Sequence, residues 1–284
     1  AVDVQPTPQP FASADLNPCL LVMPSGRIHL YYWVKDTTAA VANVQMQYSD
    51  DDGATWAVGS SACLSANVSQ AASGAGSVGF DLGRIRAAVA GGQVLLVAHL
   101  TSRNSSASLV EVLGQWASDD DGVSFTNVET WTPDTTNGLS PSVLAANNGG
   151  FIVIHALDGS TGSAMYRLSS AFQAMTSAGT TTMGGLTLGS ETVDVFRDQD
   201  QTLYMAWFST TDATQLVRST DDGLTWAHLD DDSSNTQAFW HADDANTVLS
   251  NTDYSATALE GRMVVACKFS TATGTKDDES MICL

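Results

Sequence analysis

The chain has 284 residues, 43% of them hydrophobic, and a formal net charge of −20, because 31 acidic residues outnumber 11 lysines and arginines. This length and apolar fraction allow a well-buried core in one large all-β domain or two smaller domains, and they exclude a disordered chain. Such a negative surface repels phosphate backbones and anionic lipids, so we expect neither nucleic-acid binding nor membrane insertion.

The N-terminal stretch AVDVQPTPQP has neither the basic start nor the apolar run of a signal peptide. No apolar run approaches the ~20 residues that span a bilayer. Abundant Asp, Ser, Thr, Gly and Asn favour turns and strands over helix interiors, so long helices are not expected.

Five strongly apolar runs follow one another along the chain, each introduced by a turn residue. At two, four and six positions after that residue every side chain is apolar, and the positions between are largely apolar too. This pattern is typical of strands buried on both faces. The runs are GRIHLYYWV from 26, GQVLLVAHL from 92, GFIVIHAL from 150, QTLYMAWF from 201 and GRMVVACKF from 261.

An octapeptide occurs three times, as SDDDGATW at 49–56, SDDDGVSF at 118–125 and STDDGLTW at 219–226. Its aspartate and hydroxyl side chains can accept hydrogen bonds from turn amides, its glycine permits a positive φ, and its aromatic residue can fill a gap between strands. We therefore expect it to fasten a hairpin turn. The residues that carry the repeat are Ser49, Asp51, Gly53, Thr55 and Trp56; Ser118, Asp120, Gly122, Ser124 and Phe125; and Ser219, Asp221, Gly223, Thr225 and Trp226.

These stretches resemble the Asp-box, or BNR repeat, of sialidase-like β-propellers. The second copy departs from the pattern with Phe125 in place of Trp, and RLSSAFQAM at 167–175 has neither Asp nor Gly, so that turn must be held by other groups. The aspartate runs at 50–52 and 119–121 lack the downstream glutamate of a calcium loop, so we do not expect calcium there. We expect no other metal and no cofactor.

About four short strands accompany each apolar run, which predicts a single all-β domain over residues 1–284, a five-bladed β-propeller of antiparallel blades. A six-bladed sialidase-like ring is the alternative. The last blade reaches only its third strand at ESMICL, so residues 1–7 are expected to supply its outer strand and close the ring. The blades are predicted at about 14–66, 80–128, 138–178, 190–230, and 252–284 together with 1–13.

The four cysteines, at 19, 63, 267 and 283, have no zinc-like spacing. Cys267 and Cys283 flank a predicted turn at comparable distances, so a disulfide between them is one interpretation, and two buried thiols are the other. The sequence does not decide whether Cys19 and Cys63 pair.

Ligand-binding candidates are expected at the rim opposite the octapeptides, where propeller sites usually form. The seventh position of four runs gives Trp33, His99, Phe208 and Lys268, which either hold a sugar or peptide or simply cap the strand ends. The long polar connection at 229–253 adds aromatic and titratable candidates that either bind a ligand or anchor the loop. They are Trp240, His241 and Asp243, and Trp131 is a weaker candidate of the same kind.

The resemblance to sialidases also implies a catalytic set of three arginines, a Tyr/Glu pair and an acidic residue. The first inner strand, DLNPCLLVMP, has no arginine where that family carries one. Arg84, Arg197 and Arg262 could still converge, and Tyr254 near Glu260 could form the pair, but no motif places them.

The sequence therefore favours a non-catalytic, extracellular binding or structural module that recognises a glycan or a protein. A virion decoration, tail or receptor-binding protein, or a surface adhesin, would fit its acidic, lysine-poor composition, and so would a scaffold that docks to other subunits of an assembly. The alternative is a secreted sialidase-like glycoside hydrolase, so enzymatic activity stays open.

Overall fold

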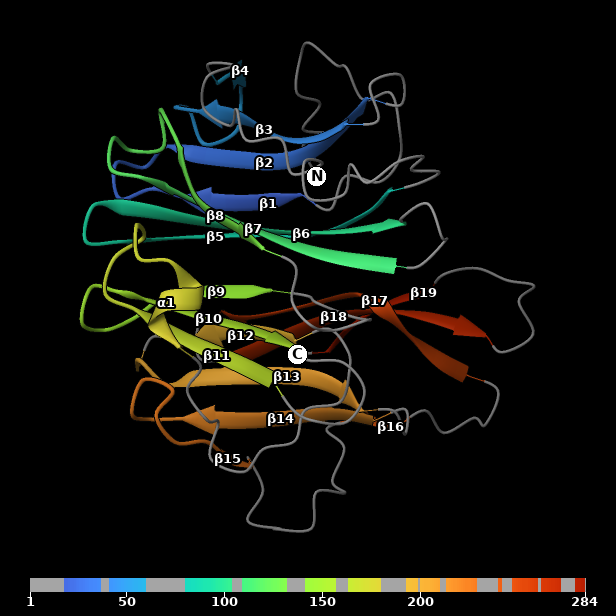
Figure 1. Ribbon diagram of the computed structural model, residues 1–284. Coiled ribbons are helices and arrows are strands. Elements are labelled where there is room, and N and C mark those ends of the chain that lie inside the picture. Colours follow the sequence, from blue (N-terminus) through green and yellow to red (C-terminus); the bar gives the residue numbers. More distant parts are fainter. Residues whose placement is uncertain are drawn as a thin grey trace. The chain divides into compact units, whose positions relative to one another are not determined.

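The structure is a computed structural model that describes most of the strand-forming parts of the chain (Figure 1). The described residues are 18–36, 41–59, 80–103, 109–131, 141–156, 163–179, 193–198, 200–209, 213–228, 240–241, 247–259, 262–271 and 279–283. They form an all-β fold with one short helix, α1 (Met175–Ala178). Within them, no helix combines the length and apolar character needed to cross a membrane.

The strands of the described residues form five sheets, numbered here in chain order. The first sheet has the order β1-β2-β3-β4 and the second β5-β6-β7-β8. The third has the order β11-β10-β9, the fourth β12-β13-β14-β15 with β16 also paired to β14, and the fifth β17-β18-β19. The bounds are β1 (Cys19–Val22), β2 (Ile28–Asp36), β3 (Val41–Ser49), β4 (Ala57–Val58), β5 (Phe80–Ala90), β6 (Gln93–Arg103), β7 (Leu109–Ser118), β8 (Thr126–Trp131), β9 (Ser142–Ala145), β10 (Phe151–Ala156), β11 (Ser163–Leu168), β12 (Val193–Arg197), β13 (Leu203–Ser209), β14 (Ala213–Ser219), β15 (Ala227–His228), β16 (Trp240–His241), β17 (Thr247–Leu259), β18 (Arg262–Thr271) and β19 (Glu279–Cys283).

The five predicted apolar runs are confirmed as strands β2, β6, β10, β13 and β18. In the second sheet the run Val94–Ala98 is completely buried, which explains why both of its faces are apolar. The fifth sheet has ESMIC as its third strand, as the sequence predicts. The expected closing strand at residues 1–7 lies outside the described residues.

The chain divides into two compact units rather than showing one continuous set of contacts. The first comprises residues 1–136, 148–151 and 167–179, and the second comprises 137–147, 152–166 and 180–284. The blade boundaries expected from the sequence stay a prediction.

The first unit has a core between the first and second sheets. The first sheet supplies Tyr31 and Trp33, both fully buried, and the second supplies a row of β6 side chains. Phe125, the last residue of the second octapeptide, also lies in this core and packs edge to face on Tyr31, with ring centroids 5.9 Å apart. The aromatic residue of the octapeptide therefore fills space between two sheets and not only between strands.

The second unit repeats this arrangement between the third and fourth sheets. Ile152 and Ile154 of β10 pack with Leu203 and Met205 of β13, and Trp226, which ends the third octapeptide, completes the cluster. The octapeptide therefore links its own sheet to the preceding sheet in both units.

Candidate functional site

The first octapeptide is a closed network of hydrogen bonds between β3 and β4. Ser49 Oγ accepts the Gly53 amide at 2.8 Å and donates to Asp51 Oδ1, also at 2.8 Å. Asp51 accepts the Thr55 amide at 2.7 Å and the Thr55 hydroxyl at 2.6 Å. Trp56 Nε1 donates to the Gly53 carbonyl at 3.1 Å. The predicted turn-fastening role of these side chains is confirmed by this geometry.

The other two octapeptides repeat the bonds of the serine and of the third-position aspartate. They do not repeat the tryptophan bond, because the second ends in Phe125 and Trp226 Nε1 of the third has no hydrogen-bond partner among the described residues. Ser118 Oγ and Ser219 Oγ accept the amides of the glycines four residues later, at 3.0 and 2.8 Å. Asp120 and Asp221 accept both the amide and the hydroxyl of the seventh residue, Ser124 or Thr225. The same serine and aspartate bonds therefore form three times, from sequences that share Ser, Asp, Asp and Gly at the first, third, fourth and fifth positions.

The bonds also fix the protonation state of the third-position aspartates. The Thr55 hydroxyl and amide and the Ser49 hydroxyl lower the pKa of Asp51 to about 2. The Thr225 hydroxyl does the same for Asp221, whose pKa is about 2 although burial opposes the change. Burial also opposes the shift at Asp120, but hydrogen bonds from Ser124 and Ser118 outweigh it and lower the pKa. These carboxylates are therefore ionised acceptors that are unsuited to proton transfer near neutral pH.

The fourth residue of each octapeptide has a positive φ, which the sequence analysis did not predict. Asp52, Asp121 and Asp222 have φ values of 56°, 61° and 61°. Aspartate is among the few residues that tolerate this region. Asp121 and Asp222 make contacts with the preceding sheet.

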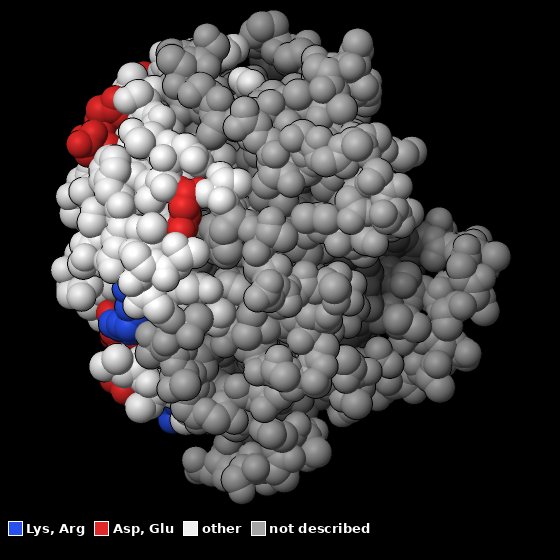
Figure 2. Space-filling model, viewed as in Figure 1, with Lys and Arg blue, Asp and Glu red and all other residues white. Residues whose placement is uncertain are grey.

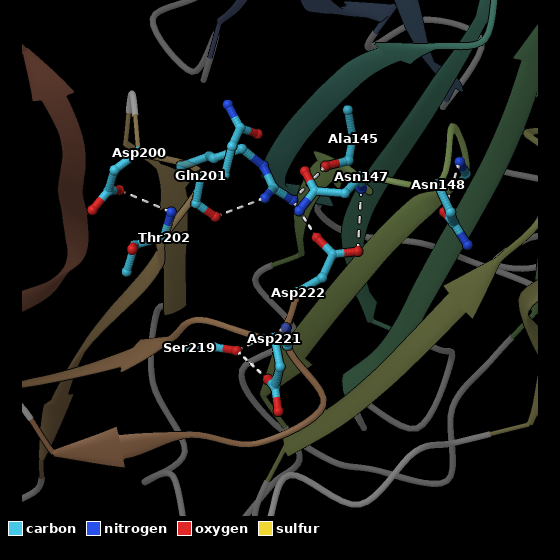
Figure 3. A network of polar contacts seen from close by, with 12 residues as sticks. Ala145, Asn147, Asn148, Asp200, Gln201, Thr202, Ser219, Asp221 and Asp222 are labelled. Atoms are coloured by element: carbon cyan, nitrogen blue, oxygen red, sulfur yellow. Dashed lines mark hydrogen bonds and ion pairs between the residues drawn. The ribbon is translucent and has the colours of Figure 1, made fainter.

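Asp222 joins the fourth sheet to the third, as Figure 3 shows around Ala145, Asn147 and Asp222. Its Oδ2 accepts the Asn147 amide at 3.1 Å, and its Oδ1 pairs with Arg197 Nη2 at 2.5 Å. Arg197 also donates to the carbonyls of Ala145, at 2.9 Å, and Gln201, at 3.0 Å. Three of the five N–H donors of Arg197 are used in this network, so Arg197 joins the third and fourth sheets, and its convergence with other arginines stays a prediction.

The second octapeptide contacts the first sheet at the corresponding place. Ser25, in the turn between β1 and β2, donates to Asp121 Oδ2 at 3.3 Å. Asn147 lies in the turn between β9 and β10, so both fourth-position aspartates bind the first turn of the preceding sheet. In the first unit, the three aspartates of the first octapeptide, Asp50–Asp52, and the three of the second, Asp119–Asp121, are all exposed. Figure 2 shows several acidic groups on the visible surface of the described residues.

The segment after β11 lacks the octapeptide residues and is held by glutamines instead. Gln173 Oε1 accepts both the amide and the hydroxyl of Ser169, at 2.8 and 2.9 Å. The fully buried Gln115 of β7 donates to the Ala171 and Gln173 carbonyls, both at 2.9 Å, and accepts the Met175 amide at 3.2 Å. Gln93 Oε1 accepts the Ser170 hydroxyl at 2.9 Å. The expectation that other groups hold this turn is confirmed.

The ligand-binding candidates of the first unit lie mostly in the interior. Trp33 is fully buried in the core between the first and second sheets, so in this structure it packs instead of presenting a surface to a ligand. His99 is buried as well, at 6% exposed. The register aligns His99 with Leu113 and Leu113 with Trp131, so the two candidates occupy one row across three strands. The side chain of Trp131 lies outside the described part of the structure.

Three candidates of the second unit lie at the end of the fourth sheet that is opposite its octapeptide. Phe208 aligns with Thr214, and Thr214 aligns with Trp240, while His241 aligns with Ala213. Trp240 and His241 thus form strand β16, although the sequence suggested a recognition loop. Lys268 aligns with Ser280 on the fifth sheet, and Asp243 lies outside the described residues. The structure does not test whether these side chains bind a ligand.

The cysteine candidates occupy neighbouring strands in a shifted register. Cys267 aligns with Met281, and Cys283 aligns with Val265, so the two cysteines are not direct cross-strand partners. Their side chains are not among those described, and the disulfide stays a prediction. Among the described residues, no group of three or more His, Cys, Asp or Glu is arranged to hold a metal ion.

Two edge strands, one in each unit, each carry a buried charged residue. Asp194 on β12 is 5% exposed and is the only buried acidic residue among those described. In the other unit Arg84 on β5 is 6% exposed and is the only buried lysine or arginine of the described set. Asp194 aligns with Ala206 of β13, whereas Arg197 aligns with Leu203, so Asp194 is displaced from the octapeptide end of the sheet. A lone Asp inside the apolar run TVDVF is the sequence signal that could have identified it.

The buried environment of Asp194 includes a second polar group. Ser142 on β9 is 3% exposed, and its Oγ accepts the amide of Val195, next to Asp194, at 3.0 Å. A buried acid in an otherwise apolar strand is a candidate functional residue.

No protein-family model matches the sequence, and no curated protein matches it. Several solved structures are similar in fold. A GH43 β-xylosidase/α-arabinofuranosidase from a compost microbial metagenome is 11% identical, with a TM-score of 0.50 over 94% of this chain and 89% of that one. An exo-1,5-α-L-arabinanase from a bovine ruminal metagenomic library is 13% identical, with a TM-score of 0.50 over 95% of this chain and 94% of that one.

The NanB sialidase of Streptococcus pneumoniae is 10% identical, with a TM-score of 0.56 over 93% of this chain and 58% of that one. Identities this low show similarity of fold alone. The chain therefore has an all-β, propeller-like fold of the kind found in GH43 and sialidase-type glycoside hydrolases.

Proposed function

We propose that this protein acts on glycans as a glycoside hydrolase, with Asp194 as one of its catalytic carboxylates. The observation that carries the proposal is the position of Asp194, a buried acid on the edge strand of a sheet in a fold shared with several glycoside hydrolases. Glycosidases generally use a pair of carboxylates on either side of the scissile bond, as acid and as base or nucleophile. The alternative from the sequence analysis thus becomes the preferred function.

The octapeptides support this assignment by exclusion. Their third-position aspartates are ionised hydrogen-bond acceptors, and Asp222 is paired with Arg197, so these acids are used in holding turns and sheets. Asp194 makes none of these turn-fastening bonds, and it lies on a different strand from the octapeptide of its sheet.

The proposed architecture is a five-bladed ring of Asp-box blades, closed by a strand from residues 1–7, with a six-bladed ring as the alternative. Support comes from the first sheet, where Leu20 and Val22 are 63% and 64% exposed, and Val58 is 55% exposed. A closed ring covers both faces of each blade, so we expect ring closure to bury these apolar side chains. Deleting residues 1–7 should lower the melting temperature if the proposal is correct and leave it unchanged otherwise.

Hydrolysis can be tested with a panel of chromogenic xylosides, arabinofuranosides, galactosides and sialosides. We expect turnover of at least one class by the wild-type protein and a loss of at least about a hundredfold in Asp194→Asn, because removing one essential proton-transfer group typically costs that much. The matched control is Asp52→Asn, an exposed aspartate at an octapeptide turn, which should retain activity. Full activity of Asp194→Asn would contradict the assignment of Asp194.

Non-catalytic glycan recognition is the second candidate, because DLNPCLLVMP lacks the arginine found at this place in sialidases. It predicts binding on a glycan array without turnover of any glycoside in the panel. An extracellular or virion-surface location stays a proposal based on the acidic, lysine-poor composition.

A further inference from the structure

A buried histidine lies directly beneath the second octapeptide. His29 of β2 is 1% exposed, and its Nδ1 lies 2.9 Å from the Tyr31 hydroxyl, while Nε2 has no hydrogen-bond partner within the described structure. The ring also contacts Tyr31 edge to face, with centroids 5.9 Å apart. One ring nitrogen is therefore buried without a hydrogen-bond partner among the described residues, an arrangement that suits a neutral imidazole and not an imidazolium.

The octapeptide turn is in direct contact with this ring. A Cβ placed on Gly122 would lie 2.5 Å from His29 Cε1 and 2.8 Å from Nδ1, so only glycine allows the turn to approach so closely. Among the residues at position five of the octapeptides, Gly53 has only Trp56 within 4 Å, at 3.8 Å. The histidine contact thus distinguishes the second octapeptide from the first.

Charged and titratable groups surround the ring from each neighbouring element. Arg27 and Tyr31 belong to the same segment, Asp121 comes from the second octapeptide and Asp50 from the first. Arg27 pairs with Asp50 at 2.7 Å, and Asp121 binds Ser25 at 3.3 Å, so both carboxylates already have partners at the surface.

We propose that His29 is an acid-sensitive latch between the first and second sheets. In the neutral form the imidazole packs under Gly122 and holds the second octapeptide against β2. When the ring takes up a proton, the imidazolium must reach water to be hydrated, and the octapeptide at 118–125 opens away from the first sheet.

The direction of the pKa shift agrees with this geometry. Burial lowers the pKa of His29, repulsion from Arg27 lowers it further, and Asp121 and Asp50 offset only part of the change. The folded pKa is below the ordinary value of 6.5, so the closed form is fully favoured above pH 6.5 and loses stability as the pH falls below it. The pKa values of Asp51 and Asp221 are about 2, so those carboxylates do not titrate in this range.

Peptide-resolved hydrogen exchange of the wild-type protein at pH 7.5 and pH 5.5, corrected for intrinsic exchange rates, tests the latch. If the ring has its ordinary pKa when open and stays neutral when closed, the opening equilibrium of 118–125 rises by up to about tenfold between these pH values. The third octapeptide, 219–226, makes the same internal bonds and serves as the internal comparison. An equal response of the two segments, or none in either, would overturn the proposal.

A pair of variants separates the latch from general acid sensitivity. His29→Gln should abolish the pH response of 118–125, because the amide does not titrate in this range. His155→Gln replaces another buried histidine, which stacks on Tyr166 in the second unit, and should leave that response unchanged. If His29→Gln does not fold, the exchange comparison within the wild-type protein still decides the question.

Discussion

Replacing Asp222 by glycine tests whether the fourth position of the octapeptide fastens one sheet to the next. The change removes the Arg197 ion pair, whose side chains are only 16% and 13% exposed, and the bond from the Asn147 amide. Charge-assisted hydrogen bonds contribute about 1.5–3 kcal/mol each. Arg197 keeps its carbonyl acceptors at Ala145 and Gln201, so we expect a loss of about 2–4 kcal/mol in the free energy of unfolding.

Asp52→Gly is the matched control, because Asp52 has nearly the same backbone conformation, with φ 56° against 61°, but is exposed and makes no ion pair within the described residues. Both variants relieve the same positive-φ strain and add the same flexibility to the unfolded chain, so these contributions cancel. Urea denaturation followed by circular dichroism gives the difference. Equal destabilisation by the two variants would refute the view that the fourth aspartate acts between sheets.

Three further predictions test other contacts. Gly122→Ala should destabilise the protein by about 1–3 kcal/mol more than Gly53→Ala in thermal denaturation, because both sites have positive φ but only Gly122 has a side chain 2.5 Å from the new Cβ. Gln115→Leu should lower the free energy of unfolding by at least about 2 kcal/mol in urea, since two buried backbone partners and one partly buried partner lose their bonds; an unchanged midpoint would contradict this. The contribution of the depressed pKa of Asp221 is present above pH 3.8 and is lost as the pH falls toward about 2, so acid titration should show Asp221→Asn with a weaker pH dependence there than the wild type.

The strands could be predicted from the sequence because their signal is local. Each run such as GQVLLVAHL carries its own burial pattern, and each octapeptide contains both the donors and the acceptors of its turn. Where the required partners lie within eight residues, the structure follows the expectation closely.

Contacts between distant segments could not be predicted in this way. The Asn147 amide and Asp222 are 75 residues apart, and Gln115 is 60 residues from the Met175 amide that it accepts. Nothing adjacent in the chain marks these residues as partners, because a single Asp or Gln fits many surface turns equally well. Trp240 and His241 were expected in a loop because their neighbours are polar, but pairing with β14 places them in a strand.

The candidate catalytic residue was missed for a related reason. Asp194 is one of 31 acidic residues, and its place in the apolar run TVDVF is a weak signal until its burial in a strand is known. Burial depends on which sheets pack together, and that information is tertiary.

The most direct test of the account is a crystal structure of the protein soaked with an oligosaccharide that it binds or cleaves. The account predicts that the sugar lies at the strand ends away from the octapeptides, within reach of Asp194, and that the hydrogen bonds of Asp51, Asp120 and Asp221 are unchanged. A sugar bound directly by those three aspartates would contradict it, because they would then be ligands for a glycan and not fasteners of turns.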